Sequence, residues 1–110
     1  MTDQEFQKRS ETALDALKRS LYDAEGEADF EVEEASGALQ INFDDPPERF
    51  IVSPNSPVRQ IWISALSTSF KLDWSDAAQG FVLAKSGEGL KALISRLINE
   101  QLGGEDIELR

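Results

Sequence analysis

Carboxylates crowd one short segment of this chain. Between positions 23 and 34, seven of twelve residues are acidic: Asp23, Glu25, Glu27, Asp29, Glu31, Glu33 and Glu34. Like charges this close repel one another, and a bound cation relieves the repulsion. Carboxylate oxygens suit hard ions such as Ca²⁺, Mg²⁺, Mn²⁺ and iron. The segment is therefore a candidate cation site, or else the solvated outer surface of an edge strand, whose charges discourage pairing with other strands.

The spacing of these acids can be compared with a calcium-binding EF-hand loop. Counted from Asp23, acids occupy positions 1, 3, 5, 7, 9 and 12, the positions that supply ligands in that loop. Position 6 is Ala28, where the sharp turn needs glycine, and the residues that follow alternate as in a strand. An EF-hand is excluded. Ligands spread along an open ridge would bind metal weakly and with little selectivity.

A second acidic pair, Glu11 and Asp15, lies four residues apart on the first expected helix and so shares one helix face. The pair could extend a metal site. Lys18 and Arg19 follow within one turn, however, and they favour an ordinary salt-bridged helix surface.

A tryptophan stands where the alternation of a strand places it away from the core. In "QIWISALS", Ile61 and Ile63 share one parity, while Gln60 and Trp62 share the other, and successive strand residues face opposite sides of a sheet. Exposed tryptophan is enriched at binding hot spots. Trp62 with Gln60 is therefore a candidate partner-binding surface; the alternative is that Trp62 lies flat against Phe70 or Trp74 as a minor cluster.

Composition limits the classes of function. The net charge of −10 is carried entirely by residues 1–48, which contain 14 acidic and four basic residues. This imbalance argues against nucleic-acid or anionic-membrane binding and for a cationic partner, either metal ions or a basic protein surface. The chain has no Cys and no His, so structural zinc sites, disulfides and imidazole catalysis are excluded, and no catalytic constellation is recognisable. The absence of a leader-like start or a long apolar run predicts a soluble, cytoplasmic protein.

Hydrophobic periodicity predicts a helix at each end of the chain and six short strands between them. Helical spacing of apolar residues spans about 4–23, with Thr2 or Asp3 as cap, and about 88–102, with Gly103–Gly104 as stop. Alternation predicts the strands 29–33, 38–43, 49–53, one around Trp62, 69–74 and 80–84. Proline-containing turns at 44–47 and 54–57 separate three of them. The tail with Ile107 and Leu109 is expected as an edge strand or a segment beside the helices.

These elements predict one α+β domain over 1–110. Short connections imply an antiparallel sheet, here of five to seven strands, because parallel neighbours need long crossovers. Two terminal helices with one apolar stripe each must cover the same face, which gives a two-layer α-β sandwich with an open second face.

The order of elements and three short motifs resemble the frataxin family. The resemblance covers about residues 4–102, and its most specific parts are Gln60-Ile61-Trp62, Asp73-Trp74 and the preceding Lys71. It implies an iron-binding regulator and iron donor of iron–sulfur cluster assembly that binds the cysteine desulfurase and its scaffold protein. The same resemblance implies a monomer, with iron-dependent oligomers as an extension, and a mitochondrial location if the chain is a mature eukaryotic form.

The resemblance also implies site residues. Weakly bound iron, Fe²⁺ or Fe³⁺, is expected on an acidic ridge made of Asp23, Glu25, Glu27, Asp29, Glu31 and Glu33. The partner surface is expected at Asn55, Gln60, Trp62 and Lys71. Two departures from the family pattern reduce or shift the iron capacity: Lys18, Arg19 and Tyr22 stand where relatives extend the ridge, and the chain has no histidine.

Two alternatives to a regulator remain open at this point. One is an iron-oxidising or iron-storing protein, in which the ridge carboxylates bind Fe²⁺ that oxygen then oxidises; weak ferroxidase activity would be the only catalysis expected. The other is an acidic adaptor that binds a basic protein surface without metal.

Overall fold

A computed structural model describes residues 1–26, 28–44, 46–103 and 107–109. A long N-terminal helix, six strands and a shorter C-terminal helix follow one another. The elements are α1 (Asp3–Glu25), β1 (Phe30–Ala35), β2 (Ala38–Asp44), β3 (Pro47–Asn55), the 3₁₀ helix η1 (Ser56–Val58), β4 (Gln60–Ala65), β5 (Thr68–Ser75), β6 (Gly80–Val82) and α2 (Leu90–Gln101).

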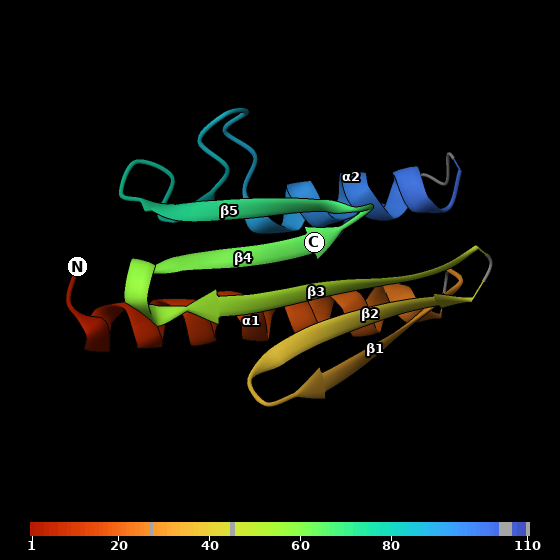
Figure 1. Cartoon of the computed structure of the whole chain (residues 1–110), viewed down its shortest axis with the longest axis horizontal. Coiled ribbons are helices and arrows are strands. Elements are labelled where there is room, and N and C mark those ends of the chain that lie inside the picture. The colour runs from red at the N-terminus through yellow and green to blue at the C-terminus, as the bar shows by residue number, and fades with distance from the viewer. Residues whose placement is uncertain (27, 45, 104–106, 110) are drawn as a thin grey trace.

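The six strands form one antiparallel sheet in chain order, with β1 and β6 at its edges. Both helices lie behind the sheet in Figure 1, on the same face, and the other face is uncovered. The structure therefore confirms the two-layer α-β sandwich. In each strand, one set of alternate residues therefore packs against the helices, and the other set faces solvent.

The core lies between the sheet and the helices. Ile61 and Ile63 of β4 are almost completely buried there, together with Phe50 of β3 and Leu17 of α1. Removing this apolar surface from water is the main force that holds the two layers together, at about 25 cal/mol per Å². Because the isoleucines point inward, the alternate residues of β4 point outward.

A tight turn fixes the register of β4 and β5. Their two-residue loop is Leu66–Ser67, and both residues have positive φ (52° and 61°). Two-residue hairpin loops with positive φ at both positions match the twist of the flanking strands. The turn places Ala65 opposite Thr68, and from there the ladder places Trp62 opposite Lys71.

The third strand is longer than the sequence indicates. We expected prolines to end it at both sides, yet β3 includes Pro47 and Pro54. Pro47 is its first residue, and Pro54 lies beyond Val52, the last β3 residue that pairs with β2. A missing N–H at Pro54 therefore faces a side of the strand that has no neighbour there, which is where sheets tolerate proline. The strand expected over 80–84 is shorter, ending at Val82.

Side-chain hydrogen bonds fix the start of α1 and the described tail residues 107–109. Thr2 caps α1 in a capping box with Glu5, as one of the two expected caps. The tail packs beside α2: Asn99 exchanges two hydrogen bonds with the backbone of Ile107, and Leu109 is buried and donates its N–H to Ser95. Of the two tail arrangements expected, the segment beside a helix is confirmed. Neither helix is both long and apolar enough to cross a membrane, as far as the described residues show.

Candidate functional site

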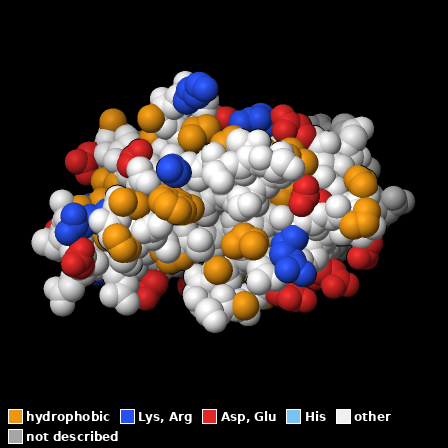
Figure 2. Space-filling model, viewed as in Figure 1, with side chains coloured by type: hydrophobic (Ala, Val, Ile, Leu, Met, Phe, Trp, Pro, Cys, Tyr) orange, Lys and Arg blue, Asp and Glu red, His pale blue; other side chains and the backbone are white. Residues whose placement is uncertain are grey.

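The register of three central strands gathers the expected partner surface on the open face. Trp62 of β4 lies opposite Lys71 of β5, and Gln60 lies opposite both Asn55 of β3 and Asp73 of β5. All four residues expected at the partner surface are thus neighbours. Figure 2 views this open face of the molecule.

Side-chain contacts hold the Trp62 indole in place. Its Nε1 donates a hydrogen bond of 2.9 Å to Oε1 of Gln60, and Gln60 Nε2 donates one of 2.9 Å to Oδ1 of Asp73. The Lys71 ammonium lies 4.9 Å from the centre of the indole ring, within cation–π range. We call Gln60, Trp62, Lys71 and Asp73 the Trp62 cluster. Its tryptophan is oriented by polar partners although 36% of its surface is exposed.

The alternative arrangement of Trp62 is wrong. Phe70 lies opposite Ile63, and Trp74 lies opposite Phe81. Both rings therefore belong to the parity that faces the helices, and they lie on the other side of the sheet from Trp62. Strand twist does not bring them together.

Sequence reasoning missed Asp73 as a member of this surface, although Asp73-Trp74 was one of the motifs of the resemblance. The signal was available, because Asp73 has the same parity as Lys71 in β5. Asn55, in contrast, was expected and is adjacent to Gln60 in the ladder, but its side chain makes no hydrogen bond within the described part of the chain. It borders the Trp62 cluster without being fixed by it.

The acidic ridge extends from the end of α1 to the outer strand of the sheet. Asp23 and Glu25 lie in the last turn of α1, Asp29 lies in the connection to β1, and Glu31 and Glu33 point outward from β1. Glu27 lies outside the described residues. In Figure 2 acidic side chains gather at the lower right, along the edge where Figure 1 shows β1. The structure confirms that β1 is an edge strand.

Glu25 has a structural partner that its spacing did not reveal. Its Oε2 accepts a hydrogen bond of 2.9 Å from the backbone N–H of Val32 in β1. That N–H is on the outer side of an edge strand, where no further strand can satisfy it. The carboxylate therefore connects the end of α1 to β1, and one of its two oxygens is already engaged in a hydrogen bond.

Lys18 is the main cation beside the acids of α1 and β1. Its ammonium lies 3.0 Å from Glu34 and 3.4 Å from Asp15, and the hydrogen bond to Glu34 raises the pKa of Lys18 above its usual range. Arg19 also approaches Asp15, at 3.9 Å. The salt-bridged interpretation is thus confirmed for Asp15. Glu11 lines the same hollow of about 400 Å³ as Asp15 and Glu34, without an ion pair of its own among the described residues.

The ridge offers hard oxygen donors, but not a preformed cage. Among the described residues, no three carboxylates converge closely enough to hold a metal ion between them. Asp23, Asp29, Glu31 and Glu33 have no intramolecular ion pair within the same part of the chain. The donor chemistry fits a hard cation, and the dispersed geometry fits weak binding.

Fold and surface together define a class: a small α-β sandwich with an acidic sheet edge and an exposed aromatic on its open face. The family model of the frataxin-like domain matches residues 1–104. The chain belongs to the frataxin family.

Named relatives agree with this assignment. The chain is 36% identical over 97 residues to the iron-sulfur cluster assembly protein CyaY of Pseudomonas aeruginosa, with 86% of this chain and 88% of the relative covered. It is 33% identical over 97 residues to the CyaY of Stutzerimonas stutzeri, covering 86% of each. The solved structure of a frataxin from Psychromonas ingrahamii superposes with a TM-score of 0.79 at 19% identity, covering 92% of this chain and 91% of that one, and so shares the fold.

Proposed function

We propose that this protein acts in iron–sulfur cluster assembly, by docking its open sheet face on the cysteine desulfurase and its scaffold protein. The names of its relatives support the pathway. The observation that carries the mode of action is the Trp62 cluster, in which an exposed indole is held by Gln60 and Lys71. Asn55 at the border of the cluster completes the contact surface.

The Trp62 cluster has the properties of a docking hot spot. An indole supplies a large apolar area, and here little side-chain entropy remains to be lost on binding, because the ring is already oriented. Lys71 and Asp73 place one positive and one negative charge beside it, so that a partner must match both signs. The surface therefore favours one orientation of the complex.

The ridge supports a second part of the proposal, in which Fe²⁺ is cargo or signal. The carboxylates without an ion pair, on β1 and just before it, would bind the ion weakly through oxygen. They lie on the same sheet as the Trp62 cluster, with β2 and β3 between. Iron on the ridge would then change the charge that a basic partner surface meets, and so adjust docking on the neighbouring face.

The test is sulfide release by a purified cysteine desulfurase with its scaffold protein, measured with and without this protein over a range of Fe²⁺. We expect an iron-dependent change of rate that Trp62→Ala abolishes. Tyr22→Ala is the matched control, because Tyr22 is also an exposed aromatic (48%) but lies on α1. Fe²⁺ binding by Trp62→Ala should stay as in the parent protein.

Three results would count against the proposal. Equal effects of Trp62→Ala and Tyr22→Ala would remove the docking surface from it. An effect on the rate that does not depend on Fe²⁺ would leave a metal-independent acidic adaptor. Stoichiometric oxidation of Fe²⁺ in air with growth of oligomers, and no effect on sulfide release, would replace the regulator by an iron-storing protein.

A further inference from the structure

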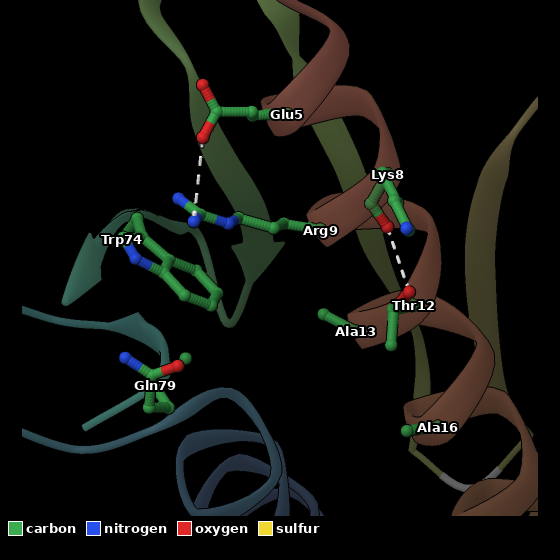
Figure 3. A pocket seen from close by; sticks show the side chains of 9 residues that line it. Glu5, Lys8, Arg9, Thr12, Ala13, Ala16, Trp74 and Gln79 are labelled. Atoms are coloured by element: carbon green, nitrogen blue, oxygen red, sulfur yellow. Dashed lines mark hydrogen bonds and ion pairs between the residues drawn. The ribbon is translucent and has the colours of Figure 1, made fainter. Parts of the chain in front are cut away.

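A groove on the helix side of the molecule is separate from both surfaces described so far. It has a volume of about 490 Å³ and lies between α1 and the edge formed by β5 and β6. Figure 3 shows Trp74 on one side of it and the α1 side chains from Glu5 to Ala16 on the other. No residue of the Trp62 cluster or of the acidic ridge lines it.

Small side chains create the space. Ala13 and Ala16 of α1 and Gly80 of β6 line the groove where larger residues would fill it. A Cβ built on Gly80 would meet only the Ala78 carbonyl oxygen, at 3.9 Å. No close backbone contact therefore requires a glycine at this position. Because Gly80 has no side chain, this side of the groove stays open.

The aromatic wall is rigidly held. Nε1 of Trp74 donates a hydrogen bond of 2.8 Å to Oδ1 of Asp76. The indole also meets the buried Phe81 ring edge to face, with 5.3 Å between centroids. Trp74 is thus oriented before any ligand arrives, which lowers the entropy cost of binding against it.

The end of the groove near the start of α1 is polar, with Glu5, Lys8 and Arg9 in its lining. The Arg9 guanidinium lies 4.4 Å from the centre of the Trp74 ring and 3.7 Å from Oε2 of Glu5, so that its charge is offset. Glu5 also accepts a hydrogen bond from the backbone N–H of Thr2, which lowers the pKa of its carboxyl. Lys8 has no ion pair within the described residues.

The α1 residues that line the groove run from Glu5 and Lys8 at its polar end to Ala16 at its apolar end. Lys8 and Ala16 are eight residues apart, which corresponds to roughly 12 Å along a helix. Between them lies Ala13, and Trp74 faces this stretch from across the groove. The arrangement matches a ligand with an anionic head and an apolar body of similar length.

We propose that this groove binds a small amphiphilic carboxylate. The carboxylate pairs with the Lys8 ammonium, and the apolar body lies between the Trp74 indole and the surface formed by Ala13 and Ala16. The volume falls within the range of small-molecule sites, about 300–1,000 Å³. The proposal does not depend on docking or on iron.

The test uses Trp74 as its own reporter. The chain has two tryptophans, so Trp62→Phe leaves Trp74 as the only one. This variant is titrated with 4-phenylbutyrate and with 4-phenyl-1-butanol, which has the same apolar body without the charge. We expect a saturable change of Trp74 fluorescence with the carboxylate, and binding weaker by about three- to tenfold with the alcohol, as for loss of one charge-assisted contact.

Further variants in this background separate charge from shape. Lys8→Gln should weaken binding of the carboxylate by about threefold or more and leave the alcohol unchanged, whereas Lys85→Gln, which removes an equal charge outside the groove, should change neither. Ala16→Met should abolish both responses by filling the groove. In the parent protein, the amide resonances of Ala16 and Gly80 should shift with the carboxylate, and this measurement decides the matter if Ala16→Met does not fold.

The proposal is overturned by any of three outcomes. The first is the absence of a saturable response to 4-phenylbutyrate. The second is equal binding of the carboxylate by Lys8→Gln and Lys85→Gln. The third is a response that persists in folded Ala16→Met, or amide shifts that avoid the groove.

Discussion

On the open face, Trp62 contacts both Gln60 and Lys71, whereas along the β1 edge most carboxylates have no intramolecular partner among the described residues. The indole N–H of Trp62 donates a hydrogen bond of 2.9 Å to the Gln60 amide oxygen. The Gln60 amide nitrogen in turn donates one of 2.9 Å to Asp73. On the ridge, Glu31 and Glu33 point into solvent without an intramolecular partner among the described residues. Contacts within the fold thus orient the Trp62 cluster, whereas they leave these two ridge carboxylates unpaired.

This difference teaches which surface can supply specificity. A preorganised aromatic loses little entropy on binding and selects a partner by shape. A row of exposed carboxylates acts through long-range charge, which salt screens over about 8–10 Å and which distinguishes one cation poorly from another. We therefore expect specific docking from the Trp62 cluster and a salt-sensitive response to cations from the ridge.

The largest expected effect is that of Trp62→Ala on affinity for the desulfurase complex. Loss of a central aromatic hot spot costs about 2 kcal/mol, or roughly a thirtyfold rise in Kd. Glu31→Gln, on the ridge, should change Kd by less than about threefold at physiological salt. Biolayer interferometry at two salt concentrations measures both. A larger effect of Glu31→Gln would reverse the comparison.

Next in size is the effect of Glu25→Ala on stability. Glu25 is the ridge member that accepts the Val32 N–H, so its removal should lower the free energy of unfolding by about 1 kcal/mol. Glu33→Ala removes the same charge from β1, where no intramolecular bond is lost, and should leave stability unchanged or slightly higher. Urea denaturation of both variants distinguishes the two roles. Equal changes would mean that the ridge acts only through its total charge.

A smaller effect is expected from Lys18→Gln on cation binding. Lys18 occupies the space between Asp15 and Glu34 with its own ammonium. Its removal should strengthen Mn²⁺ binding there by about threefold, since two carboxylates lose an internal counter-ion. Arg19→Gln is the control, because Arg19 is 79% exposed and lies 3.9 Å from Asp15. Paramagnetic broadening of the Asp15 and Glu34 resonances measures the difference, and a stronger effect of Arg19→Gln would contradict the assignment to Lys18.

The sequence alone predicted the fold well, because both periodicities were unambiguous. Alternation in β4 predicts that Trp62 points away from the core, and the α2 pattern of leucines and isoleucines predicts that this helix packs on the sheet. The prediction that prolines end the third strand was wrong. Whether β3 can include Pro54 depends on where its neighbour β2 ends, and strand pairing is set by the tertiary structure.

The sequence predicted which residues belong to the candidate sites, but it did not predict the contacts that these residues make. Spacing showed that Glu25 is acidic and close to β1 in sequence, but not that it satisfies the Val32 N–H, because the approach of a helix end to a strand edge depends on the whole packing. The groove beside Trp74 had no sequence signal of its own. Its lining joins α1 to residues more than 55 positions later, and it becomes visible only in the folded chain.

The smallest expected effect is the pH dependence contributed by Lys18. The hydrogen bond to Glu34 raises the pKa of Lys18 above the reference value of 10.5. A raised folded pKa means that the ammonium contributes its full stabilisation below the unfolded pKa and loses it as pH rises through the folded pKa. The difference in stability between the parent protein and Lys18→Gln should therefore be constant from pH 7 to about 9.5 and shrink above roughly 10.5. Denaturation of both proteins over this range measures it. A difference that stays constant through pH 11 would mean that Lys18 stabilises the fold through packing of its methylenes rather than through its charge. The contrast between a charge-dominated β1 edge and a contact-dominated Trp62 cluster would then be weaker.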